Sequence, residues 1–227
     1  MKFENIEVFN FKNAIRGMRN PLESWDKSDS TWDEPVNGNV CAKKGFVLGP
    51  KDLELAQRLI AAGPEHRKFM RQIMVSVDIT APLYWWKEFD TYKVATVANS
   101  TSTMHKLAST PITMDCFEMD DYEPSLLMYE REPYNIDNYV SDIWENIIGY
   151  LETLRLRYLK TKDKRYWKEL IRLLPESWLQ TRTVTMNYET LLSIVHQRSG
   201  HKLVEWHAFI DDFIKTLPYS KELILKN

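Results

Sequence analysis

Cysteine is scarce in this sequence, and its scarcity argues against several classes of site. The chain of 227 residues holds only two cysteines, Cys41 and Cys116, which lie in unrelated contexts without CxxC or CxxH spacing. We therefore expect no disulfide framework, no zinc or other metal site and no cysteine nucleophile. This usage is typical of a reducing compartment, so we expect a cytoplasmic protein.

Long apolar runs and a strong net charge are also missing. The first residues, MKFENIEVFNFKNAIRG, have no apolar core of the kind a signal peptide needs, and no run reaches the length of a membrane span. The net charge of −2 does not favour a dedicated nucleic-acid partner. Because GxSxG, HExxH, P-loop and GxGxxG motifs are absent, the usual hydrolase, metalloprotease, nucleotide triphosphate and Rossmann functions have no sequence basis.

The hydrophobic content is ample for a core, and its periodicity indicates both strands and helices. Hydrophobic residues make up 44% of the chain, and no Gly/Ser/Pro-rich linker divides it. Ile73, Val75, Val77 and Ile79 alternate with more polar residues, which predicts a half-buried strand. Two apolar stripes at helical spacing predict long helices in the second half: Tyr139, Ile143, Ile147, Leu151, Leu154 and Tyr158, then Tyr166, Trp167, Leu170, Ile171 and Leu174.

Shorter signals complete the predicted architecture. We expect a strand over residues 2–11, a helix from Pro50 to Gly63, a short strand through Thr181, Thr183 and Thr185, and two final helices broken at Gly200. Residues 20–49 are rich in turn formers and predict a long ordered loop pinned by its tryptophans. The whole predicts an α+β single domain over residues 1–227, with a small mixed sheet packed against several long helices.

Residues 81–105 are the stretch around which the chain is organised. They begin as an aromatic-rich helix opened by Pro82 and end in five hydroxyl and amide residues, from Asn99 to Thr103. Such a run offers side-chain and backbone donors to a polar ligand, although an ordinary solvated turn has the same composition.

Two further clusters have both a functional and a structural interpretation. Cations crowd around aromatic residues from Arg155 to Lys168, which is compatible with binding a phosphate backbone. A solvated helical hairpin with snorkelling side chains explains the same pattern and agrees better with the overall acidity. His196, His201 and His207 lie on different helix faces, so we do not expect them to share a metal ion.

The stretch 81–105 resembles the signature helix and loop of the flavin-dependent thymidylate synthases, the ThyX family. That family has an Ala-Pro opening, a Trp-containing helix, an Arg-His-Arg triplet, a serine and an Asn-Glu-x-Ser-x-Arg loop. Ala81-Pro82 and Trp86 match the opening and the helix, and Thr91-Tyr92-Lys93 occupy the triplet position. Thr96 stands for the serine, and Asn99-Ser100-Thr101-Ser102 stand for the start of the loop.

Two other stretches follow the same family pattern in the same order. Upstream, Glu65-His66 and Phe69 are similar to its Glu-His-x-x-Phe sequence. Downstream, the matching residues are Leu174-Pro175, Thr185, Asn187, Leu191, His196, Arg198, His201 and Glu205. The resemblance is strongest over residues 60–210, with a helical insert at about 125–173.

The resemblance implies an enzyme that methylates dUMP to dTMP, with FAD as cofactor and NADPH and methylenetetrahydrofolate as co-substrates. It also implies a homotetramer whose sites form between subunits. Carried over by position, the cofactor-binding residues are Tyr92, Lys93, His196 and Arg198. The substrate-binding residues are Glu88, Asn99, Ser100, Thr101, Ser102 and Arg182, and the catalytic ones are His207 and Ser102.

The departures from the family pattern fall on charged positions. Thr91, Lys93 and Met104 stand where the family has arginines, and each lost charge-assisted hydrogen bond is worth roughly 1.5–3 kcal/mol. Losing two or three of them forfeits roughly 3–6 kcal/mol, or about a hundredfold to ten-thousandfold in affinity. We therefore expect the scaffold to survive with weakened, altered or lost synthase activity; a non-catalytic nucleotide-binding or interaction protein is the other interpretation.

Overall fold

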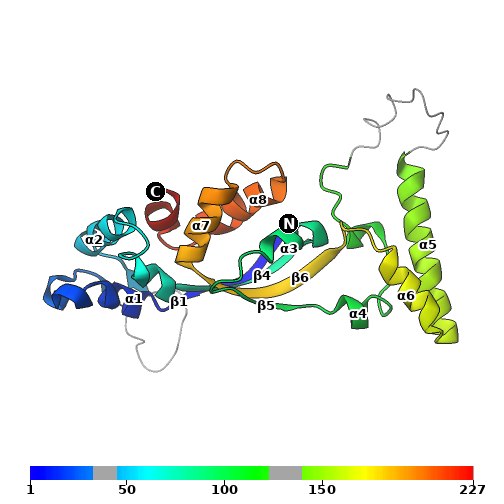
Figure 1. The fold of residues 1–227 in the computed structure, drawn as a ribbon, viewed down its shortest axis with the longest axis horizontal. Helices are drawn as coiled ribbons and strands as arrows, with labels where there is room; N and C mark the ends of the chain where they lie inside the picture. Colours follow the sequence, from blue (N-terminus) through cyan, green and yellow to red (C-terminus); the bar gives the residue numbers. More distant parts are fainter. Residues whose placement is uncertain (33–44, 123–139, 227) are drawn as a thin grey trace. The chain divides into compact units, whose positions relative to one another are not determined.

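The computed structural model describes residues 1–32, 45–122 and 140–226 (Figure 1). Within these ranges helices and strands mix along the chain, and the predicted α+β class is confirmed. The strands are β1 Lys2–Phe9, β2 Thr31–Trp32, β3 Phe46–Val47, β4 Met74–Pro82, β5 Val97–Ser100 and β6 Leu179–Asn187. The helices are α1 Phe11–Met18, α2 Pro50–Ala61, α3 Leu83–Phe89, α4 Thr103–Lys106, α5 Val140–Thr161, α6 Lys164–Arg172, α7 Tyr188–Arg198 and α8 Val204–Ala208.

Four of the strands form one sheet in the order β1-β4-β6-β5, and β2 pairs with β3 in antiparallel register. The chain divides into two compact units. The terminal unit comprises Met1–Ile79, Asp90–Asn99 and Thr183–Asn227, and the central unit comprises Thr80–Phe89 and Ser100–Arg182. The expectation of one ThyX-like domain over the whole chain stays a prediction.

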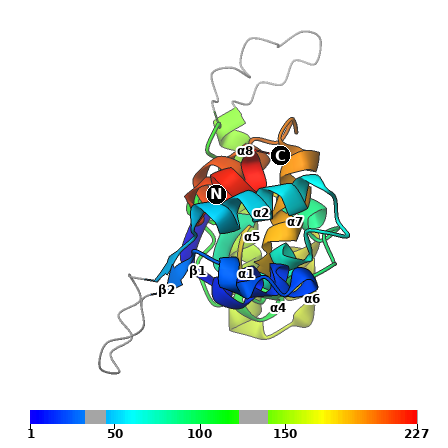
Figure 2. The same ribbon diagram turned by 90° about the vertical axis from the view of Figure 1, so that its left-hand side faces the viewer.

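The core of the terminal unit is built from β4 and the helices that follow β6. Val75, Val77 and Ile79 are fully buried and alternate with partly exposed neighbours, which confirms the predicted half-buried strand. Helix α7 begins where the Asn187 side chain accepts a hydrogen bond from the backbone N–H of Thr190 at 2.9 Å, a normal N-cap. Figure 2 shows this unit with α1 and α2 towards the viewer.

The core of the central unit includes buried residues of the helices α5 and α6, which run side by side (Figure 1). Both were predicted from their apolar stripes, and both are confirmed. Leu151, Leu154 and Leu170 are buried with Leu107, Ile112 and Phe117 in one hydrophobic cluster. The first residue of the predicted stripe, Tyr139, lies outside the described residues.

Two sequence interpretations need correction. Asn99 to Thr103 do not form an open loop, because Val97–Ser100 is strand β5 and Thr103 begins α4. The backbone N–H of Thr101 donates to the carbonyl of Thr181 at 2.9 Å. This donor is therefore used in pairing with β6 and is not left for a ligand.

The second correction concerns Arg155, which is not a solvated cation of a basic face. Its side chain is buried, and its guanidinium donates to the Glu152 carboxylate at 2.5 and 2.7 Å and to the Ala108 carbonyl at 3.2 Å. The Arg155 side chain therefore ties α5 to the segment after α4 and adds nothing to a nucleic-acid surface.

Candidate functional site

The segment after α3 and the first turns of α7 enclose a hollow of about 270 Å³ in the terminal unit. We call it the triplet hollow because Thr91, Tyr92 and Lys93 line it. The α7 side comprises Glu189, Thr190 and Ser193. Lys93 is exposed, so its ammonium is accessible to a polar ligand.

The charge of the triplet hollow is set by an ion-pair cluster at its edge. The Glu189 carboxylate accepts hydrogen bonds from Arg67 at 3.1 Å and from Arg71. Burial raises the pKa of Glu189, but the hydrogen bonds from Arg71 and Arg67 outweigh it and hold the pKa below its usual value. The Glu189 carboxylate is thus ionised and paired with Arg67 and Arg71, while Glu65 also interacts with Arg71, and Lys93 adds a further cation to the lining.

Tyr92 connects the triplet hollow to a cation held by aromatic rings. Arg198 donates from Nε to the Tyr92 hydroxyl at 2.9 Å, and that hydroxyl donates to Gln197 Oε1 at 3.1 Å. The guanidinium carbon lies 4.7 Å from the centre of the Trp206 ring and 5.6 Å from that of Tyr92. Arg198 is thus fixed in orientation, which is what recognition of a planar or anionic group requires.

The structure brings together three of the four residues predicted for the cofactor, namely Tyr92, Lys93 and Arg198. The fourth, His196, is exposed near the end of α7. His207, predicted as catalytic, is exposed on α8, and Asn99 is exposed on β5. The roles of all six residues remain predictions.

A second hollow, of about 160 Å³, lies in the central unit and is lined by two of the predicted substrate-binding residues, Thr101 and Ser102. Three consecutive hydroxyl residues, Thr101, Ser102 and Thr103, line it together with Lys106 and Trp178. The backbone N–H of Lys106 donates to the Ser102 carbonyl at 2.9 Å, so one helical turn brings the lysine beside the hydroxyls. We call this the hydroxyl hollow.

Gln180 links the hydroxyl hollow to Arg182. Its side-chain N–H group donates to the Thr101 carbonyl at 3.0 Å and to the Thr103 hydroxyl at 3.2 Å, while its Oε1 accepts from Arg182 Nε at 2.9 Å. The Arg182 guanidinium packs 4.2 Å from the Trp86 ring, and the Trp86 indole donates to the Gln180 carbonyl at 2.9 Å. These contacts with Gln180 and Trp86 fix the position of the Arg182 side chain. Of the other predicted substrate residues, Ser100 is exposed at the end of β5 and Glu88 is partly exposed on α3.

The sequence interpretation did not include Lys106, Gln180, Thr190 or Ser193. Two of them carried a usable signal. Lys106 lies four residues after Ser102, the spacing of one helix face, and Gln180 lies two residues before Arg182, on the same side of a strand. Thr190 and Ser193 carried none, because only the tertiary structure brings α7 to the triplet segment.

The described part of the chain contains no group of three or more histidine, cysteine, aspartate or glutamate side chains placed to hold one metal ion. Among the described helices, none has both the length and the apolar character needed to cross a membrane.

Comparison with known proteins supports the resemblance at the level of fold. No protein-family model and no curated protein sequence matches the chain. Two solved structures of the flavin-dependent thymidylate synthase ThyX from Helicobacter pylori, each with FAD and dUMP, match it at 18% identity. One gives a TM-score of 0.65 over 99% of this chain and 98% of that one, and the other 0.66 over the full length of both. The chain therefore has the ThyX fold.

Proposed function

We propose that this chain is a divergent flavin-dependent thymidylate synthase-like protein that methylates a pyrimidine deoxynucleotide, dUMP to dTMP. The observation that carries the proposal is the full-length fold match to ThyX structures complexed with FAD and dUMP. In this proposal FAD is the cofactor, and NADPH and methylenetetrahydrofolate are co-substrates. The working form is a homotetramer in the cytoplasm.

The triplet hollow is the proposed site for part of the cofactor. Its exposed ammonium, beside a guanidinium held on aromatic rings, fits the anionic and planar groups of FAD. When bound, FAD would supply the redox step of the methyl transfer. Lys93 would neutralise phosphate charge, and Arg198, with its orientation fixed by Tyr92, would contact the cofactor with little loss of side-chain entropy.

The hydroxyl hollow is the proposed site for the nucleotide phosphate. Ser102 and Thr103 offer hydroxyl donors, and Lys106 offers the cation. The aligned family loop carries its arginine at the position of Met104, so Lys106 would replace that charge from two residues further along. Gln180 holds the run in place through its bonds to Thr101 and Thr103, which limits the ordering required on binding.

A non-catalytic nucleotide-binding protein is the second candidate, and one observation favours it. Thr91 and Met104 have no charge where the family has arginines, while Arg198 already interacts with Tyr92 and Trp206. Such a protein would keep the hydroxyl hollow for a nucleotide and would have lost the flavin.

Titration of the purified protein separately with FAD and with dUMP, by calorimetry and by visible absorbance, tests the proposal. Lys93→Met and Lys106→Met are matched variants, because each removes one exposed ammonium from one hollow. We expect K93M to weaken FAD binding by about tenfold to a hundredfold, with dUMP binding unchanged, and K106M to do the reverse.

Lys202→Met removes an exposed cation elsewhere in the chain and should change neither affinity. Colourless protein that takes up no added FAD but binds dUMP would support the second candidate. Protein that binds neither ligand would refute both.

A further inference from the structure

A third hollow, of about 230 Å³, lies in the terminal unit and contains none of the residues assigned to FAD or dUMP. It lies between α1 and the segment from Arg19 to Trp32. Among the described residues, the lining combines three cations, two tryptophans and one serine: Lys12, Arg16, Arg19, Trp25, Ser28 and Trp32. We call it the α1 hollow.

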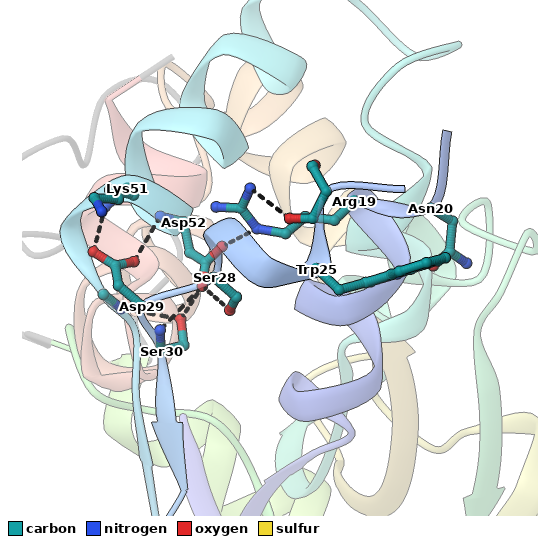
Figure 3. A network of polar contacts seen from close by, with 10 residues as sticks. Arg19, Asn20, Trp25, Ser28, Asp29, Ser30, Lys51 and Asp52 are labelled. Atoms are coloured by element: carbon teal, nitrogen blue, oxygen red, sulfur yellow. Dashed lines mark hydrogen bonds and ion pairs between the residues drawn. The ribbon is translucent and has the colours of Figure 1, made fainter. Parts of the chain in front are cut away.

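One lining residue, Arg19, belongs to a buried ion pair with Asp52 (Figure 3). Arg19 donates from Nε to Asp52 at 2.5 Å, and both side chains are almost fully buried. The same carboxylate accepts bonds from the Ser28 hydroxyl at 2.6 Å and from the backbone and hydroxyl of Ser30 at 3.1 and 2.6 Å. Asp52 therefore accepts several hydrogen bonds, and among the described residues Arg19 is the cation paired with it.

The other two cations of the hollow lie on tryptophan rings. Lys12 Nζ is 5.7 Å from the centre of the Trp32 ring, and the Arg16 guanidinium is 5.3 Å from that of Trp25. The rings are themselves held, since Trp32 stacks on Phe46 at 4.1 Å and the Trp25 indole donates to Asn20 at 2.9 Å. Aromatic faces orient cations without cancelling their charge.

Lys12 and Arg16 are one turn apart on α1, where two like charges destabilise a helix slightly. The position of Arg16 in the last turn of α1 explains a cation there, because a helix C-terminus carries partial negative charge. It does not explain why Lys12, one turn earlier, lines the same hollow. Within the described residues neither side chain forms an ion pair with a carboxylate.

We propose that the α1 hollow binds the phosphoryl or diphosphoryl group of a small anionic ligand between Lys12 and Arg16. The hollow is smaller than the roughly 300 Å³ at which sites for whole drug-sized ligands begin, so it suits a compact anionic group. Arg19 holds the floor and stays paired with Asp52. This proposal is independent of the synthase proposal, because the two share no residue.

Calorimetric titration with inorganic diphosphate at low salt tests the site. The Lys12→Met, Arg16→Gln double variant removes both charges while keeping two exposed side chains of similar length. Lys27→Met is the matched control, since Lys27 is an exposed cation of the same region that does not line the hollow. All titrations are made in a Lys106→Met background, which removes the cation of the hydroxyl hollow and limits diphosphate binding there.

We expect saturable binding to the chain with K106M alone and at least about a tenfold weakening in the double variant, from the loss of charge-assisted contacts. The Lys27→Met control should keep the original affinity, and an unchanged thermal unfolding midpoint should show that the double variant is folded. Absence of saturable binding, or equal affinity in the double variant, would each overturn the proposal.

Discussion

Replacing Asp52 by asparagine would measure how much of the terminal unit's stability depends on one buried carboxylate. The substitution keeps the shape of the side chain but removes its charge, so Arg19, which is 5% exposed, would be left as an unbalanced buried cation. Breaking a buried ion pair from one side typically costs about 3–5 kcal/mol. For a chain of this size that corresponds to a fall in Tm of roughly 6–20 °C, measurable by scanning calorimetry.

The same carboxylate gives the prediction a pH dependence. Burial raises the pKa of Asp52, but hydrogen bonds from Ser28, Ser30 and Arg19 outweigh it and hold the pKa below the ordinary 3.8. A lowered pKa stabilises the folded state fully above the unfolded value and progressively less as the pH falls through the folded value. The stability difference between the original chain and D52N should therefore shrink below about pH 4.

Asp26→Asn is the matched control, because Asp26 is an exposed aspartate in the same region of the chain. We expect it to change stability by less than about 0.5 kcal/mol. If D52N unfolds at the same temperature as D26N at neutral pH, the buried pair does not stabilise the protein and does not hold Arg19 rigidly beside Lys12 and Arg16.

Two further predictions concern Trp86, whose indole binds the start of β6, and Glu189, in the first turn of α7. Trp86→Phe should destabilise the central unit by about 1–3 kcal/mol, as measured by urea unfolding. The Gln180 carbonyl loses its indole donor, and the Arg182 guanidinium loses the tryptophan ring on which it packs. Glu189→Gln should remove a stabilisation that is present at neutral pH and lost as the pH falls through the lowered folded-state pKa of Glu189, so unfolding curves of variant and original should converge in acid. Refutation would be a W86F chain as stable as the original, or a stability gap for E189Q that does not depend on pH.

Much of the architecture was predictable because burial imposes a period on the sequence. Val75, Val77 and Ile79 alternate since one face of β4 is buried, and the stripe through Leu151 and Leu154 follows one face of α5. Strand β5 was missed for the complementary reason. Its four residues, Val97–Ser100, are all exposed, so no hydrophobic period marks them.

The candidate site was predictable only where the chain itself brings residues together. Tyr92 and Lys93 are neighbours in sequence, and Thr101 and Ser102 are as well. Arg155 shows the limit of such reasoning. Its charge predicted a solvent-exposed side chain, and only the contacts with Glu152 and Ala108 in the folded structure show that it is buried. Likewise, the hydrogen bond from Arg198 to Tyr92 joins residues 106 positions apart, and no local pattern encodes it.

The relation between Met104 and Lys106 gives a prediction that separates compensation from coincidence. If Lys106 supplies the charge that the family places at position 104, then Met104→Arg should restore dUMP binding in a K106M background. Met104 is 51% exposed, and the bond that its residue accepts from the Trp167 indole uses a backbone carbonyl, so an arginine should be tolerated there.

Restoration should recover most of the roughly 1.5–3 kcal/mol lost with Lys106, as measured by dUMP calorimetry on single and double variants. Thr110→Arg in the same background is the matched control, because it places an arginine at an exposed residue that lines the hydroxyl hollow. Equal rescue by T110R would mean that any nearby cation suffices, and no rescue by M104R would mean that Lys106 does not replace the loop arginine.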